Sequence, residues 1–325
     1  MLMTRRLLLA AAGAATLAPA ARAQGDAAPW PNRPIRLVVP FAAGGAADSA
    51  ARAITPVMAQ RLGQTIVVEN RTGAGGSVGG GAVAAAAPDG HTLLWDASSH
   101  LVNPALMRGL PFDYAAFTPV SLVVTFPGVL AVKRDVPART VAEFVALARA
   151  RPGAISVGTQ GNATAGHMGL LQFCKRAGIE VIHAPYRGGA DAARDLAAGA
   201  IDAAFITTVS AGPIVDSGRA RFLAVATLQR VPSRPDVPTL AESGYPGFES
   251  NEWAALFGPP GLPASIVGAL HATLATALAD EGVRQRLAQI GAVPVGSPPE
   301  EFARFVREGR EQMAALVQEA GIRLD

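Results

Sequence analysis

Short apolar runs of strand length alternate with helix-prone stretches in the first third of the chain. The runs Ile35–Val39, 65–69 and 92–95 are rich in Val, Ile and Leu, whereas segments 48–62 and 82–87 are rich in alanine. Runs of the first kind favour strands, and stretches of the second kind favour helices. Because the two kinds alternate, this part of the chain is predicted to form a mostly parallel sheet flanked by helices.

The same alternation starts again after Pro119 and predicts a second α/β lobe. Thr140 is followed by Glu143 at the capping-box spacing, which marks the start of a helix. Strands are expected at 129–132, 155–157, 180–183 and 201–206, and helices at 141–150, 164–177 and a segment ending at Leu196.

The last part of the chain adds helices without a third sheet. One strand-like stretch begins at Trp253, and helices are expected at 266–278, 281–290 and 299–319. We expect these helices to pack on the first lobe, so that lobe 1 comprises residues 24–125 and 252–325 and lobe 2 comprises residues 126–251. The two crossovers, near 120–127 and 250–257, would then form a hinge about a cleft.

The N-terminus has the pattern of a cleaved export signal over residues 1–23. Arg5 and Arg6 precede an apolar run at 7–17, and Ala21-Arg22-Ala23 supplies small residues for a signal peptidase. The apolar run is shorter than the roughly 20 residues that span a bilayer. The sequence therefore predicts a soluble protein exported by a Sec or twin-arginine signal.

Loss of the signal changes the charge of the chain. Removing Arg5, Arg6 and Arg22 leaves 25 of the 28 Lys and Arg residues, which equals the 25 Asp and Glu residues. The mature chain thus has no formal net charge, so neither a nucleic-acid surface nor binding to anionic lipid is implied. Cys174 is the only cysteine, and its place among Leu170 and Leu171 predicts a buried thiol.

Glycines gather where predicted strands lead into predicted helices. A helix N-terminus leaves backbone N–H groups unpaired at the positive end of the helix dipole, and glycine allows a ligand to approach that backbone closely. Such turns suit a carboxylate, and in an open parallel sheet they lie where ligands bind. The four glycine turns, two in each lobe, contain Gly44-Gly45, Gly73 with Gly75-Gly76, Gly161, and Gly188-Gly189.

Enzymatic interpretations of the same turns are weaker. No phosphate-loop lysine follows the glycines, and 79–84 matches the dinucleotide fingerprint only with a terminal alanine. The run from Gly75 to Gly79 resembles a nucleophile elbow around Ser77, which keeps a hydrolase as an alternative. However, an elbow serine follows its strand directly, whereas seven residues separate Ser77 from its strand.

The five histidines lack the spacing of metal ligands, so neither a metal nor a cofactor is expected. His91, His100 and His271 are interpreted as surface or packing residues. His167, in the first turn of a helix opened by Thr164, could donate to a ligand oxygen or serve in capping and packing.

From Pro31 to the C-terminus, the chain resembles the Bug family, the solute-binding receptors of tripartite tricarboxylate transporters. The resemblance rests on seven ordered motifs: residues 34–48 (PIRLVVPFAAGGAAD), 67–76 (VVENRTGAGG), 88–94 (PDGHTLL), 159–167 (TQGNATAGH), 183–188 (HAPYRG), 221–226 (RFLAVA) and 238–244 (PTLAESG).

This resemblance implies a two-lobed fold like that of periplasmic binding proteins, without catalysis. The receptor would close on a dicarboxylate, tricarboxylate, aromatic acid or acidic amino acid and deliver it to the membrane permease subunits of its transporter. A sensory derivative of the receptor remains an alternative. The ligand-binding residues implied are Phe41, Ala42, Gly44, Gly45, Asp48, Asn70, Ala74, Gly75, Gly76, Ser98, Thr159, Gly161, Thr164, His167, Tyr186, Arg187, Gly188 and Thr207.

Two positions depart from the family pattern. Ala163 replaces a glycine, and Asp191 stands where a proline is common. A carboxylate beside the cleft would repel an anionic ligand unless Arg187 or Arg194 neutralised it or the ligand carried an amine. Amino-acid specificity is therefore one hypothesis for this chain.

Overall fold

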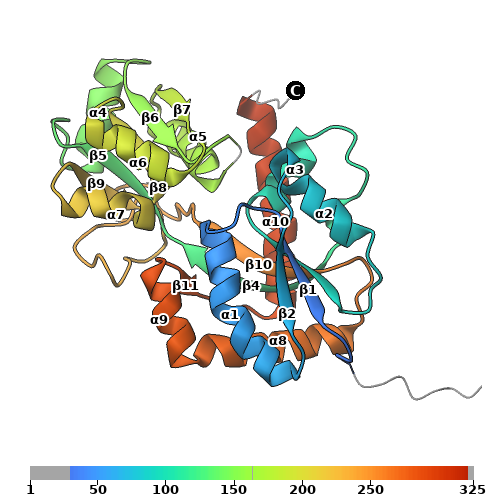
Figure 1. The fold of residues 1–325 in the computed structure, drawn as a ribbon. Coiled ribbons are helices and arrows are strands. Elements are labelled where there is room, and N and C mark those ends of the chain that lie inside the picture. The colour runs from blue at the N-terminus through green and yellow to red at the C-terminus, as the bar shows by residue number, and fades with distance from the viewer. Residues whose placement is uncertain (1–29, 163, 321–325) are drawn as a thin grey trace, which may run out of the picture.

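The structure is a computed structural model that describes residues 30–162 and 164–320. It confirms the two-lobed α/β fold, with one sheet in each lobe (Figure 1). The expected signal peptide and Ala163 lie outside the described residues.

The first sheet has six strands in the order β11-β4-β10-β3-β1-β2. The strand β1 pairs in parallel with β2 and β3, whereas β10 pairs antiparallel with both β3 and β4. The bounds are β1 Ile35–Val39, β2 Ile66–Asn70, β3 Thr92–Asp96, β4 Thr118–Phe126, β10 Glu252–Gly258 and β11 Val293–Pro294.

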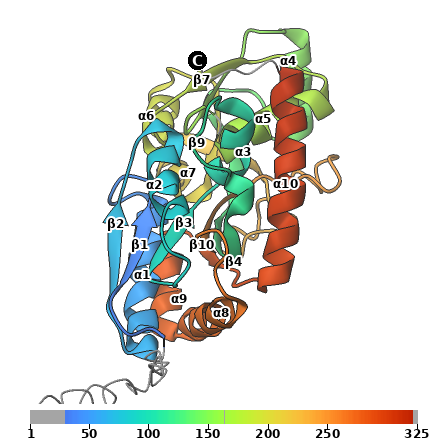
Figure 2. The same ribbon diagram turned by 90° about the vertical axis from the view of Figure 1, so that its right-hand side faces the viewer.

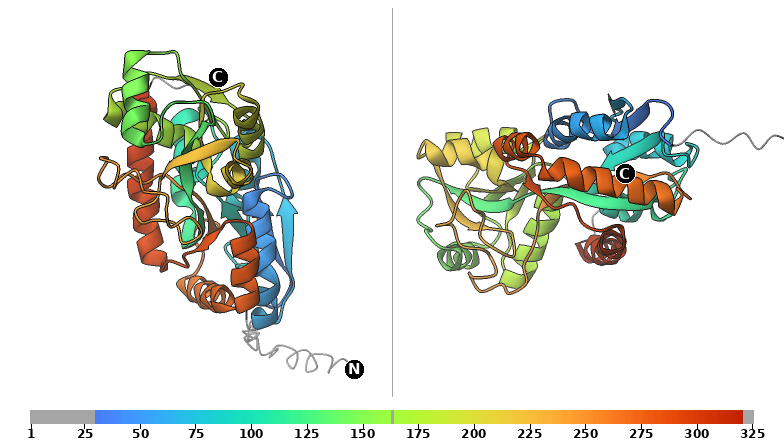
Figure 3. Two further views of the ribbon diagram at one scale, coloured as in Figure 1. Left: turned by 90° about the vertical axis from the view of Figure 1, so that its left-hand side faces the viewer. Right: turned by 90° about the horizontal axis from the view of Figure 1, so that it is seen from below.

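Helices cover both faces of the first sheet. One face packs on α1, α8 and α9, and the other on α2, α3 and α10, so that α1 and α10 lie on opposite sides of the sheet (Figure 3). The helix α10 lies beside α3 over much of its length (Figure 2). The bounds are α1 Ala46–Leu62, α2 Ser77–Ala84, α3 Ser99–Leu106, α8 Ala264–Ala279, α9 Glu281–Gln289 and α10 Pro299–Ala320, with short 3₁₀ turns η1 Ala74–Gly76 and η2 Tyr114–Ala116.

The second sheet has five strands in the order β7-β6-β8-β5-β9. The strand β6 pairs in parallel with β7 and β8, while β5 is antiparallel to β8 and β9. Helices α4 and α5 pack on one face, and α6 and α7 on the other. The bounds are β5 Gly128–Lys133, α4 Val141–Ala150, β6 Ser156–Thr159, α5 Ala165–Ala177, β7 Ile182–Pro185, α6 Gly189–Ala198, β8 Ala203–Thr207, α7 Thr208–Asp216 and β9 Ala220–Val225.

Each sheet is mixed, whereas a mostly parallel sheet was expected. The cause is the pair of crossover segments: β4 leads directly into β5, and the chain returns to the first sheet as β10, antiparallel to β4. Most of the segments 120–127 and 250–257, which were interpreted as crossovers, therefore lie in β4 and β10. Only Pro127 separates β4 from β5.

The two crossovers touch where they pass between the lobes. The Gly128 N–H donates to Asn251 Oδ1 at 3.1 Å. A Cβ on Gly128 would lie only 2.3 Å from the carbonyl oxygen of Ser250, so only glycine fits. The close approach of the two backbones explains this glycine at the start of β5.

Local signals in the sequence account for the helix starts in the second lobe. The capping box at α4 is confirmed, because Thr140 accepts from the Glu143 N–H and Glu143 accepts from the Thr140 N–H. The Thr164 hydroxyl caps α5 by accepting from the His167 N–H. Within the described part of the chain, no helix combines the length and apolar character needed to cross a bilayer.

Candidate functional site

The loop after β1 is shaped by a buried carboxylate. Asp48 is only 2% exposed, and its carboxylate accepts from the Gly44 N–H at 2.8 Å, from Arg52 Nε at 3.0 Å and from Asn70 Nδ2 at 2.9 Å. Burial alone would raise the pKa of Asp48, but these hydrogen bonds outweigh burial and hold the pKa below its ordinary value. Asp48 is therefore a charged anchor for the loop.

The side chain of Asn70 is also engaged inside the protein. Its Nδ2 donates to the Phe41 carbonyl at 3.0 Å, and its Oδ1 accepts from Arg52 Nη2 at 2.9 Å. Asp48 and Asn70, both predicted to bind ligand, thus hold the turn in shape. Ala42, Gly44 and Gly45 of this turn are exposed, although the Gly44 and Gly45 N–H groups donate to Asp48 and to the Ala42 carbonyl.

Sequence reasoning missed Arg52, which joins these two side chains. Its spacing of four residues from Asp48 on one helix was the available signal.

The loop after β2 has an unusual run of backbone conformations. Ala74, Gly75 and Gly76 have φ of 43°, 60° and 94°, directly before α2 begins. The Gly75 carbonyl accepts from Asn103 Nδ2 at 2.9 Å, which ties the loop to α3. A tight turn of this kind at a helix N-terminus can present several N–H groups to one anion.

In the second lobe, the loop after β6 is closed by hydroxyl groups. The Gly161 carbonyl accepts from Thr159 Oγ1 at 3.2 Å and from Thr164 Oγ1 at 2.9 Å. Gly161 has a φ of 142°, which favours glycine. Thr159 is fully buried and also lies 2.7 Å from His183 Nε2.

His167 and His183 stack face to face inside this lobe. Their ring centroids are 4.0 Å apart and their planes differ by 8°. Burial and then the neighbouring His183 lower the pKa of His167 to about 4, and burial also lowers the pKa of His183. Both rings are therefore neutral at pH 7. His167 is 5% exposed, which favours packing among the alternatives for this residue, and ligand contact by its ring stays a prediction.

The turn after β7 combines a fixed tyrosine with an open glycine. The Tyr186 hydroxyl donates to Asp195 at 2.9 Å, while Arg187 is exposed. Gly188 caps α6 in an extended conformation, and a Cβ there would have no neighbour within 4 Å. At the start of α7, Thr207 Oγ1 lies 3.0 Å from Ser210 Oγ.

Asp191 follows in the first turn of α6, 3.1 Å from Arg194. Arg194 therefore pairs with this carboxylate. Neutralisation by Arg194 was one of the alternatives given for Asp191 in the sequence analysis.

One carboxylate joins predicted site residues of both lobes. Glu252, the first residue of β10, accepts from Ser98 Oγ of the first lobe at 2.9 Å. From the second lobe it accepts from Gln160 Nε2 at 3.0 Å and from the Ala165 N–H at 2.8 Å. Burial raises the pKa of Glu252, although all three hydrogen bonds oppose that shift. The sequence offered no signal for this bridge, because it depends on contacts between distant segments.

A cavity of about 820 Å³ lies between the lobes. Of the predicted site residues, only Ser98 lines it, together with Ala165 beside Thr164. A shallower hollow, beside the N-terminus of α1, is lined by Gly44 and Asp48 with Arg52 and Arg286. The structure thus brings Ser98 to the Gln160–Ala165 loop through Glu252, while the turns at Gly44, Gly75 and Gly188 lie outside the large cavity.

Other chemistry at these loops finds no structural support. Ser77 begins α2 after a 3₁₀ turn, so no strand leads directly into it as in a nucleophile elbow. Among residues 30–162 and 164–320, no three His, Cys, Asp or Glu side chains cluster as metal ligands would. Cys174 is partly buried rather than fully buried as expected, and burial raises the pKa of its thiol to about 12, so the thiol is protonated at pH 7.

Comparisons with known proteins agree with this geometry. The family described as "Tripartite tricarboxylate transporter family receptor" matches residues 50–322. The protein BugT of Bordetella pertussis is 33% identical over 99% of this chain and 99% of its own length.

Two solved structures are similar over almost their whole length. The R. palustris protein Rpa4515 with adipate is 34% identical, covers 91% of this chain and 100% of its own, and has a TM-score of 0.79. MatC from Rhodopseudomonas palustris with bound malate is 34% identical, covers 88% and 99%, and has a TM-score of 0.74.

Proposed function

This chain belongs to the tripartite tricarboxylate transporter family of receptors, and on that premise we propose that it captures a small carboxylate between its lobes. The family consists of solute-binding receptors, so the chain is a receptor and not an enzyme. In the proposed cycle, the protein is exported to the periplasm, binds its solute, and delivers it to the permease subunits of a membrane transporter.

The observation that carries the proposal is the set of glycine turns at helix N-termini. Gly45 and Gly76 precede α1 and α2 in the first lobe, and Thr164 and Gly188 cap α5 and α6 in the second. A helix start places unpaired N–H groups at the positive end of a dipole, where a carboxylate is stabilised. At α5, however, the N–H groups of Ala165 and His167 already donate to Glu252 and Thr164. Turns from both lobes suit a molecule with two anionic ends.

The side chains around these turns support an anionic ligand. Asp48 and Asn70 are turned inward to Arg52 and the backbone, so the loop after β1 does not direct a free carboxylate outward. Asp191 is paired with Arg194, which removes the main reason for requiring a ligand amine. Arg187 is exposed beside Gly188 and offers a cation to the ligand.

Two relatives with bound ligands support a ligand class. Rpa4515 holds adipate and MatC holds malate, both of which are dicarboxylates. We therefore place dicarboxylates first, ahead of tricarboxylates, aromatic acids and acidic amino acids. The hinge would lie where Pro127 joins β4 to β5 and where Asn251 precedes β10, with lobe 1 as 24–125 plus 252–325 and lobe 2 as 126–251.

A thermal-shift screen of the purified mature protein against these four acid classes tests the proposal. A ligand at 100 times its dissociation constant stabilises a protein by about 2.7 kcal/mol, which gives a clear rise in Tm. Gly188→Leu is the diagnostic variant, because its backbone is extended and the space around its Cβ is open. The variant is expected to fold normally and to lose the ligand-induced shift.

Gly268→Leu is the matched control. Gly268 also has open space around its Cβ, but it lies on α8, far from the glycine turns in sequence and on the other side of the first lobe from α2 and α3. This variant is expected to keep the full shift. Absence of a shift with every acid, or an equal loss in both variants, would count against the proposed function.

A further inference from the structure

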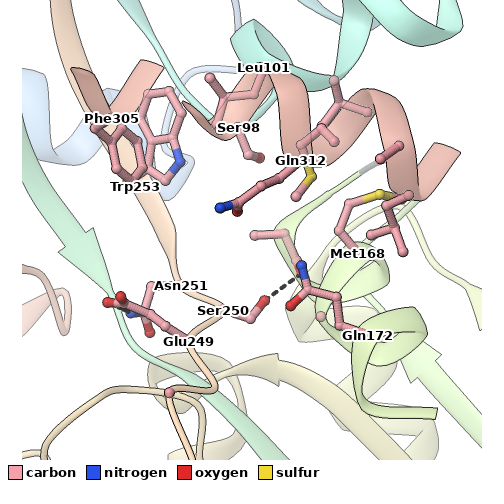
Figure 4. A pocket seen from close by; sticks show the side chains of 18 of the residues that line it. Ser98, Leu101, Met168, Gln172, Glu249, Ser250, Asn251, Trp253, Phe305 and Gln312 are labelled. Carbon is pink, nitrogen blue, oxygen red and sulfur yellow. Dashed lines mark hydrogen bonds between the residues drawn. The ribbon is translucent and has the colours of Figure 1, made fainter. Parts of the chain in front are cut away.

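The large cavity between the lobes is separate from the glycine turns. The helices α3 and α10 of the first lobe form one side of it, α5 of the second lobe forms another, and the start of β10 forms its floor (Figure 4). Its walls are mainly apolar, with Leu101, Val102, Met168, Trp253, Phe305 and Leu316 among the lining residues. A cavity of this size can hold a small organic molecule.

The indole of Trp253 places an N–H group at the wall of the cavity. The residue is only 5% exposed, and its ring packs edge-on against Phe302 and Phe305. Its Nε1 makes no hydrogen bond to the described residues, and Figure 4 shows the nitrogen facing the cavity. By contrast, the unpartnered indole nitrogens of Trp30 and Trp95 are enclosed by protein.

An indole N–H can only donate a hydrogen bond, so a ligand group that binds to it must be an acceptor. Gln312 extends its amide into the same space from α10 (Figure 4). The cavity therefore offers an apolar surface with hydrogen-bonding groups directed inward.

Charged groups at the rim already contact other protein groups. Lys175 forms an ion pair with Glu319, which links α5 to α10. The guanidinium of Arg176 lies over the Phe248 ring and donates to the Pro246 carbonyl. Glu249 accepts from Asn251 Nδ2. Lys175 and Glu319 neutralise each other, and an uncharged ligand leaves all of these contacts in place.

We propose that this cavity is a second binding site, for an uncharged small molecule with an apolar body and one acceptor oxygen. The oxygen accepts from Trp253 Nε1, and the apolar body lies against Met168 and Phe305. This site goes beyond the carboxylate site proposed above and shares only Ser98 with the predicted ligand-binding residues. A molecule held there touches both lobes, so its binding free energy is linked to the angle between them.

A matched pair of probes tests the site. Acetophenone and ethylbenzene have the same ring and chain length and differ in one carbonyl oxygen. Their dissociation constants are measured by ligand-observed NMR titration of the full mature protein without any acid. A neutral hydrogen bond contributes about 1 kcal/mol, so acetophenone should bind about fivefold more tightly than ethylbenzene.

Two variants locate the binding. Trp253→Phe keeps an aromatic ring and removes the N–H, so it should weaken acetophenone about fivefold and leave ethylbenzene unchanged. Ala315→Trp adds bulk at the cavity from the exposed side of α10 and should abolish binding of both probes. Circular dichroism confirms that each variant is folded.

The proposal is overturned by any of three results. These are no binding of either probe to the wild type, equal affinity of acetophenone for wild type and Trp253→Phe, or unchanged binding to Ala315→Trp. None of these results depends on whether a carboxylate binds at the glycine turns, and Gly188→Leu should bind both probes normally.

Discussion

Glu252→Ala should weaken the connection between the lobes more than any other single carboxylate substitution near the crossovers. The wild-type carboxylate accepts from Ser98 Oγ, Gln160 Nε2 and the Ala165 N–H, at distances of 2.8 to 3.0 Å. Hydrogen bonds to a charged group contribute about 1.5–3 kcal/mol each, and they are not additive. Because the side chain is only partly buried and water can replace some of these bonds, we expect a total loss of about 3 kcal/mol.

Thermal unfolding followed by circular dichroism measures this loss. At about 2–4 °C per kcal/mol for a chain of this size, the Tm should fall by about 6–12 °C. Glu249→Ala is the matched control, because Glu249 is an exposed neighbour with one hydrogen bond, to Asn251. The control should lose less than about 1 kcal/mol. Equal Tm values for Glu252→Ala and Glu249→Ala would refute the bridge between the lobes.

Further predictions concern the loops and the crossover. The pKa of Asp48 is lowered in the folded state, so its charge stabilises the fold above the unfolded pKa of 3.8, and this stabilisation is lost as pH falls below that value. Urea unfolding at pH 7 should therefore show Asp48→Asn to be about 1–3 kcal/mol less stable than wild type. The difference should shrink at pH 3. The pKa of His167 is lowered to about 4, so the free energy of unfolding of wild type should fall by up to about 3 kcal/mol as pH falls from 6.5 to 4. A His167→Phe variant that kept this loss would contradict the neutral histidine stack. Gly128→Ala places a Cβ 2.3 Å from the Ser250 carbonyl and should cost about 1–3 kcal/mol in the same assay, whereas Gly188→Ala, with open space around it, should cost less than about 0.5 kcal/mol.

Local patterns in the sequence predicted the strands and helices that carry their own signals. The strand Ile35–Val39 and the helix Val141–Ala150 have the expected bounds, the first from its β-branched run and the second from its capping box. By contrast, β4 was interpreted as part of a crossover. Its place in the first sheet depends on pairing with β10, which lies more than 120 residues away in sequence. The strands at 129–132 and 201–206 were predicted, but their antiparallel pairing was missed for the same reason.

The candidate site could be predicted only where it is formed by backbone turns rather than by side-chain contacts. Glycines at strand ends marked the turns at Gly45, Gly76 and Gly188. The sequence could not show that Asp48 and Asn70 turn inward, since that depends on Arg52 from the next turn of α1. Glu252 was missed because its three partners come from two segments far from it in sequence, Ser98 and the loop between β6 and α5.

The measurement that tests the central claim most directly is isothermal titration of the acid that gives the largest thermal shift, compared with its amide of the same shape. The amide keeps the size and the planar shape, but it removes the charge that the helix N-termini stabilise and replaces one acceptor oxygen by an NH2 donor. We predict one-to-one binding of the acid, at least about tenfold weaker binding of the amide, and no binding of the acid to Gly188→Leu. Equal affinity for acid and amide, or full affinity of Gly188→Leu for the acid, would contradict capture of a carboxylate at the glycine turns.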